Sequence, residues 1–137
     1  MKKILASLMV AVLLLSIVGG STALAWGWQK IGQDYFSRTG NLSVISADQE
    51  DYRLVFSFPN GCWQDNTSQP AVEFELWEED VFFDDYVGSG KVYSSGGTFT
   101  FNLDGYDSYG KVEPYVKITA FRCVNSGSAK VEYYQWD

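Results

Sequence analysis

Apolar and polar residues alternate along most of the chain, and the alternation is clearest in residues 72–77. There Val72, Phe74 and Leu76 alternate with two glutamates and Trp77. A period of two is the pattern of a strand that buries one face and exposes the other. The same pattern predicts strands at 52–58, 72–77, 98–103, 115–121 and 129–136, with shorter ones around 41–46 and 90–93.

Turn-forming residues separate these segments. Clusters rich in glycine, asparagine or proline occur at 59–61, 88–90, 96–97, 104–105 and 125–127. About seven short strands with this spacing are typical of an antiparallel β-sandwich, because buried parallel strands would read as continuous apolar runs. We therefore predict an all-β fold, a single antiparallel sandwich. Besides 72–77, the expected core positions are Leu54, Phe56, Phe58, Phe99, Phe101, Leu103, Val116, Ile118 and Ala120.

The first 25 residues have the features of a secretory signal peptide. Lys2 and Lys3 precede an apolar run over 4–18, and Ala23-Leu24-Ala25 provides an A-x-A cleavage site. An uncleaved anchor is the alternative, but this run is shorter than the roughly 20 residues of a spanning helix. We expect residues 26–137 to form one exported domain, secreted from a bacterial cell and without a membrane segment after cleavage.

The expected mature domain is strongly acidic. Without Lys2 and Lys3, 8 of the 10 basic residues remain against 17 acidic ones, which is a net charge of −9. Such a surface repels phosphate backbones and anionic membranes. Nucleic acid is therefore excluded as a partner.

The chain contains two cysteines, Cys62 and Cys123. An even number in an exported chain predicts a disulfide. Closing a loop of about 60 residues would stabilise the domain by about 4 kcal/mol on the chain-entropy model. The alternative, a redox role, lacks a C-x-x-C motif.

Composition also argues against catalysis. The chain has no histidine, so histidine-dependent triads and imidazole bases are excluded. It has no G-x-S-x-G motif, and the carboxylates Asp80 and Asp85 would need a substrate cleft to hydrolyse a glycoside. We expect a non-enzymatic protein.

Two acidic segments follow expected strands, at 78–85 and 107–113. If they meet at one end of the sandwich, their carboxylates could bind Ca²⁺, which prefers six to eight oxygen ligands. The candidate ligands are Glu78, Asp80, Asp85, Asp107 and Glu113. The alternative is a solvated acidic rim and no cofactor.

The order of motifs between Val72 and Cys123 resembles that of the transthyretin-like (prealbumin-like) secreted β-sandwiches. The matching steps are Leu76-Trp-Glu-Glu-Asp80, Asp84-Asp85, Gly97-Thr-Phe-Thr-Phe101 and Pro114-Tyr-Val-Lys-Ile118, followed by Cys123. This resemblance implies a transthyretin-like sandwich.

The acidic segments are also similar to the calcium loops of C2 domains. Asp107-x-x-Gly110-x-x-Glu113-Pro-Tyr-Val-Lys117 is close to the pattern D-x-x-G-x-x-D-P-Y-V-K, and Trp77-Glu-Glu-Asp80 is close to W-D-x-D. The two loops stand in the opposite order here. The likeness implies calcium, whereas the transthyretin-like order is the better guide to the fold.

Aromatic residues provide a second candidate surface. Trp77, Tyr115 and Phe121 fall on the outward phase of their strands, and Trp63 lies in the Cys62 loop, residues 59–70. Exposed rings can bind sugar rings or an apolar patch of a partner; alternatively, they pack against loops.

These features predict a secreted, non-catalytic binding protein whose partner is an extracellular protein or polysaccharide. The alternative function is a small effector, either antibacterial or an inhibitor of an extracellular enzyme. The Cys62 loop with Trp63 would then be the inhibitory loop.

Overall fold

The computed structural model describes residues 27–106, 111–124 and 127–137, and this part of the chain contains eight strands and no helix. The strands are β1 (Trp28–Phe36), β2 (Gly40–Asn41), β3 (Asp51–Ser57), β4 (Val72–Glu78), β5 (Asp85–Val92), β6 (Gly97–Asn102), β7 (Pro114–Phe121) and β8 (Ala129–Trp136). The proposed signal peptide, residues 1–25, and the candidate ligand Asp107 lie outside the described residues. No described helix has the length and apolarity to cross a membrane.

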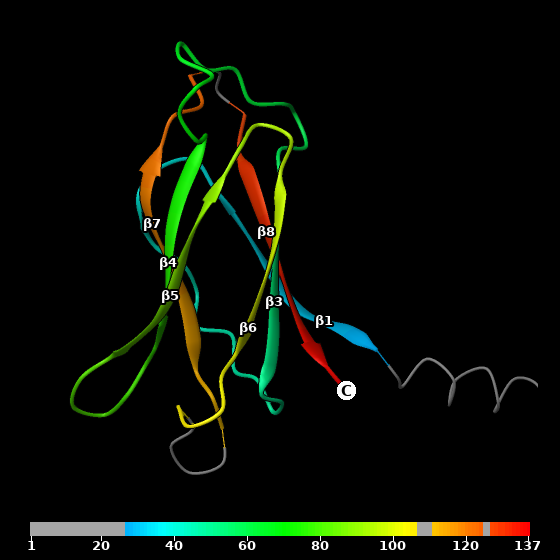
Figure 1. Ribbon diagram of the computed structural model, residues 1–137, viewed down its shortest axis with the longest axis vertical. Helices are drawn as coiled ribbons and strands as arrows, with labels where there is room; N and C mark the ends of the chain where they lie inside the picture. The colour runs from blue at the N-terminus through cyan, green and yellow to red at the C-terminus, as the bar shows by residue number, and fades with distance from the viewer. Residues whose placement is uncertain (1–26, 107–110, 125–126) are drawn as a thin grey trace, which may run out of the picture.

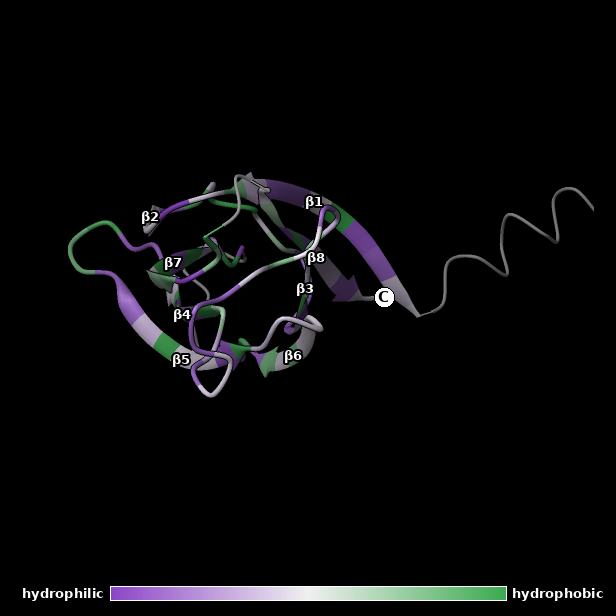
Figure 2. Cartoon of the chain, turned by 90° about the horizontal axis from the view of Figure 1, so that it is seen from above, coloured by the Kyte–Doolittle hydropathy of each residue, from purple (hydrophilic) through white to green (hydrophobic). Residues whose placement is uncertain are grey.

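The strands form two antiparallel sheets of four strands each. Sheet A has the order β1-β8-β3-β6, and sheet B has the order β2-β7-β4-β5. The chain passes between the sheets at both lateral edges, from β1 to β2 and from β5 to β6 through a tight turn at 93–96. Figures 1 and 2 show the sheets curving around a shared interior. The predicted all-β sandwich is confirmed.

Aromatic rings fill the interior between the sheets. Phe56 of sheet A lies 4.8 Å from Phe74 of sheet B, measured between ring centroids, and Phe99 lies 4.9 Å from Phe74. These rings occupy space that glycines leave open on the edge strand β5. A Cβ at Gly90 would lie 2.5 Å from Phe74 and 2.7 Å from Phe99. Glycine is therefore required there by the packing of the two sheets.

Five strands lie close to their predicted positions, two differ from them and one is new. The short strand expected around 90–93 begins earlier and is longer, as β5 over Asp85–Val92. The expected strand at 41–46 is reduced to β2 and an isolated bridge between Ala47 and Val112. Strand β1 was not predicted. Its pairing with β8 shifts register between Lys30 and Gly32, which interrupts the period-two pattern that reveals the other strands.

A register shift between β4 and β7 also reverses which of the last residues of β7 point inward. Pairing with β4 slips between Glu73 and Phe74, so that Phe121 lies opposite the buried Val72. The prediction that Phe121 points outward is wrong: its ring packs against the core, 5.9 Å from that of Phe36. Ala120, predicted to point inward, instead pairs with Glu73 on the outer side. One extra residue reverses the alternation.

The predicted disulfide is present between Cys62 and Cys123. Cys62 follows β3 of sheet A, and Cys123 follows β7 of sheet B, so the bond joins the two sheets at the end of the sandwich opposite the acidic loops. The closed loop spans 61 residues in sequence. The bond therefore lowers the conformational entropy of the unfolded chain, which stabilises the folded domain.

Substituting Gly90→Ala is expected to destabilise the domain by about 1–3 kcal/mol, because the new methyl group overpacks the Phe74 and Phe99 rings. Urea denaturation would measure the change. Ser89→Ala, an exposed neighbour on the same strand, is the matched control and should change stability by less than about 0.5 kcal/mol. Equal stability of the two variants would show that the glycine is not needed for packing.

Candidate ligand-binding groove

Three aromatic side chains form a row across the outer face of sheet B. Tyr115 of β7 lies opposite Trp77 of β4, and Trp77 lies opposite Tyr86 of β5. The Trp77 and Tyr86 rings are 5.4 Å apart and meet edge to face. Trp77 and Tyr115 are half-buried, whereas Tyr86 is exposed. The expected outward positions of Trp77 and Tyr115 are confirmed, and the structure places them side by side.

A bulge in β5 determines which residue completes the row. Leu76 pairs with Gly88, but the next residue, Trp77, pairs with Tyr86, so β5 has one extra residue, Val87. Val87 packs against the core. Without this bulge, the regular register would place Val87 opposite Trp77. The bulge thus turns an aromatic side chain outward beside Trp77.

The loop between β4 and β5 projects from the sandwich. We call residues 79–84 the finger. Its tip is Val81-Phe82-Phe83, whose side chains are 75%, 88% and 83% exposed. Figure 2 shows this hydrophobic tip standing away from the body beside the start of β5. A compact apolar projection of this kind is typical of an interaction site.

One carboxylate fixes the base of the finger to the aromatic row. The Tyr115 hydroxyl donates a hydrogen bond to Asp84 Oδ2 at 2.5 Å, and the Asp80 backbone N–H donates to Asp84 Oδ1 at 3.3 Å. Burial, followed by the bond to Asp84, raises the pKa of Tyr115 to about 12. The hydroxyl is therefore protonated at physiological pH and remains a donor.

The finger and sheet B border a shallow, open groove of about 440 Å³. Its lining consists of Asn41, Trp77, Phe82, Phe83, Asp84, Tyr115 and Lys117. This volume is within the range of small-ligand sites, and the mixture of apolar rings and a few polar groups is typical of them. Of this lining, the sequence analysis identified Trp77 and Tyr115 as surface residues but not Asn41, Phe82, Phe83, Asp84 or Lys117. It also missed Tyr86, which lies beside Trp77 next to the groove. An apolar trio between acidic residues was a signal that the loop tip would be exposed.

The described part of the second acidic segment, residues 111–113, lies beside the first at one end of the sandwich. The Glu79 backbone N–H donates to the Glu113 carbonyl at 2.9 Å, and the Glu113 N–H lies 3.4 Å from Glu78 Oε1. Glu78 itself lies opposite Asp85 in β5 and Pro114 in β7. Four of the five predicted ligands, Glu78, Asp80, Asp85 and Glu113, therefore belong to one end of the fold.

Glu78 is the unusual member of this group. Its side chain is 1% exposed, and its Oε2 atom has no hydrogen-bond partner. Burial raises its pKa, and the nearby charges of Asp80, Asp85 and Glu113 raise it further. Among the described residues, no three acidic, cysteine or histidine side chains are grouped so as to hold a metal ion.

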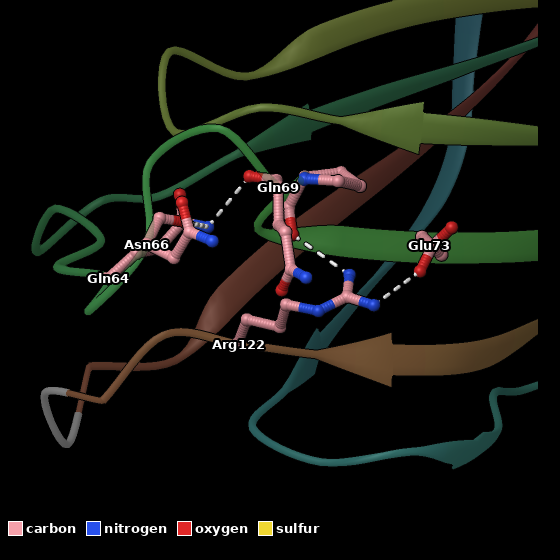
Figure 3. A network of polar contacts seen from close by, with 6 residues as sticks. Gln64, Asn66, Gln69, Glu73 and Arg122 are labelled. Carbon is pink, nitrogen blue, oxygen red and sulfur yellow. Dashed lines mark hydrogen bonds and ion pairs between the residues drawn. The ribbon is translucent and has the colours of Figure 1, made fainter.

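The remaining predicted surface residue, Trp63, lies at the opposite end of the sandwich. Its side chain is 63% exposed, and the Cys62 loop that carries it is held by internal contacts. The buried Gln64 side chain donates to the Gln69 carbonyl at 3.0 Å, and Arg122 donates to the Pro70 carbonyl at 3.0 Å (Figure 3). The loop is therefore preorganised.

The carbonyl of Trp63 accepts a hydrogen bond from the Val124 N–H at 2.8 Å. A substrate-like inhibitory loop must instead present the carbonyl of its anchoring residue to the oxyanion hole of the enzyme. This geometry leaves the Trp63 side chain as the exposed feature. The effector alternative stays a prediction.

Comparisons with protein-family models, with curated proteins and with solved structures found no match. The resemblances to transthyretin-like proteins and to C2 calcium loops therefore stay predictions.

Replacing Glu78 with glutamine is expected to raise the melting temperature at pH 7.5 in EDTA. The raised pKa means that ionised Glu78 destabilises the folded state, and this penalty grows as pH rises from its ordinary pKa of 4.5 through the raised value. The advantage of Glu78→Gln should therefore disappear below about pH 4. Thermal melts between about pH 3 and 8 would measure it. Glu79→Gln, an exposed neighbour, is the control; equal effects of both variants would contradict the role of burial.

Proposed function

We propose that this chain is an exported, non-catalytic binding protein whose ligand lies in the groove between the finger and the outer face of sheet B. The observation that carries the proposal is the row Tyr115–Trp77–Tyr86 beside the exposed finger tip. Tryptophan and tyrosine contribute much of the energy at binding surfaces, because they offer a large contact area at a small entropy cost.

The groove is also prearranged for binding. Asp84 ties the finger to Tyr115, and the β5 bulge orients Tyr86. A ligand would therefore not need to order these groups, which lowers the cost of association. The signal peptide expected from the first 25 residues supports export, and the ligand of the groove would then be extracellular.

Site-specific photo-crosslinking in the producing cells tests this function. A benzophenone amino acid at Phe82 is expected to give discrete adducts, and the added substitution Trp77→Ala should remove them. The same probe at Tyr93, an exposed position in the turn at the opposite end, is the matched control. No adducts at Phe82, or equal adducts at both positions, would contradict a ligand site in the groove.

A calcium ion at the acidic end is a second proposal, supported by the buried, unpartnered Oε2 of Glu78. The carboxylates that raise its pKa are like charges brought together at the base of the finger. A bound cation would compensate them and hold the finger against sheet B. Backbone carbonyls and water would complete its coordination.

Thermal melts of residues 26–137 in EDTA and in millimolar calcium test this proposal. Calcium at about 100 times its dissociation constant would stabilise the domain by about 2.7 kcal/mol, a shift of several degrees. The shift should be lost in Glu78→Gln and kept in Glu73→Gln, a glutamate near the other end of β4. An unchanged wild-type melt would identify the acidic end as a solvated rim.

A further inference from the structure

A polar row runs beside the aromatic row on the outer face of sheet B. Asn41 of β2 lies opposite Lys117 of β7, and Lys117 lies opposite Glu75 of β4, which in turn pairs with Ser89 of β5. Lys117 and Glu75 are each two residues from the aromatic row along their strands, and Ser89 is three residues from Tyr86 because of the bulge at Val87. The spacing between the rows is therefore about 7 Å.

The polar row offers both hydrogen-bond donors and hydrogen-bond acceptors. Within the described part of the chain, Lys117 makes no ion pair, and Asn41 makes no side-chain hydrogen bond. Both are exposed, and both line the groove. Glu75 accepts a long 3.4 Å bond from the Trp77 indole N–H, which leaves its other oxygen available. Hydrogen-bond donors and acceptors thus form one row across the face, directly beside the row of rings.

This combination fits one ligand chemistry better than others. A sugar ring has an apolar C–H face that packs on an aromatic ring and hydroxyls around its edge that both donate and accept. The aromatic row provides the first contact, and the polar row provides the second. An apolar ligand such as a lipid acyl chain would leave the amide of Asn41 and the charges of Lys117 and Glu75 without partners.

Charge indicates which kind of glycan the groove would bind. Lys117 is the single cation of the groove lining, and Asp84 and Glu75 lie close to it. With a net charge of −9 on residues 26–137, the domain repels polyanions. An acidic polysaccharide is therefore disfavoured, whereas a neutral one pays no such penalty.

Resting on the function proposed above, we infer that the ligand of the groove is a neutral polysaccharide whose sugar rings stack on Trp77 and Tyr115 while their hydroxyls bond to the row Asn41–Lys117–Glu75. The finger then forms one wall of the site, with Phe82 and Phe83 against the chain of sugars.

Affinity electrophoresis of the exported protein tests the inference. Gels would contain hydroxyethylcellulose, arabinoxylan, glucomannan, mixed-linkage β-glucan or amylopectin, with alginate and polygalacturonate as acidic counterparts. At least one neutral polymer should retard the wild type relative to serum albumin. Trp77→Ala should weaken that binding by about tenfold or more, and Lys117→Met should weaken it severalfold, while Trp136→Ala, a half-exposed tryptophan at the end of sheet A, should leave it unchanged.

Three results would overturn the inference: no retardation by any neutral polymer, retardation that survives Trp77→Ala, or retardation by the acidic polymers alone. The crosslinking at Phe82 separates this failure from failure of the proposed function. Adducts of Phe82 with a protein, combined with no retardation, would keep the groove as a binding site and reject the glycan. Folding of each variant is checked by its urea midpoint.

Discussion

The packing of phenylalanine rings against glycines of β5 is the contact on which the sandwich depends. Phe74 and Phe99 occupy the space that a side chain at Gly90 would need, and Phe101 lies over Gly88 in the same way. Each ring thus contributes apolar contact between the sheets at the edge where the chain crosses from one to the other. The glycines weaken β5 as an isolated strand, and the rings offset that loss.

Strand β5 also positions an aromatic residue of the groove region near its N-terminal end. Its glycines face the core, while the bulge at Val87 brings Tyr86 to the outer face beside Trp77. The groove is therefore a product of core packing as well as of surface residues. Because the finger leads directly into β5, a change in the position of this strand would move the finger tip and Tyr86 together. Binding and stability are coupled at this edge of sheet B.

The two ends of the sandwich differ in construction. At one end the disulfide between Cys62 and Cys123 and the amide of Gln64 hold the connections by covalent and hydrogen bonds. At the other end acidic side chains gather around the buried Glu78, where charge repulsion opposes packing. That repulsion lies at the base of the finger, so a cation or a proton at this end would act on the groove through backbone contacts between Glu79 and Glu113.

The sequence by itself determined the fold class, the disulfide and the outward positions of Trp77 and Tyr115, because period-two alternation and paired cysteines are local or countable signals. The tertiary structure decided what depends on register. Bulges moved Phe121 into the core and aligned Tyr86 with Trp77. The position of such a one-residue shift cannot be read from the alternation of apolar and polar residues. It also brought Lys117 and Asn41 beside the rings, since these two residues are 76 positions apart in sequence yet lie opposite each other in sheet B. Which residues lie side by side on neighbouring strands is decided only when the chain folds, and the groove is built from residues of this kind.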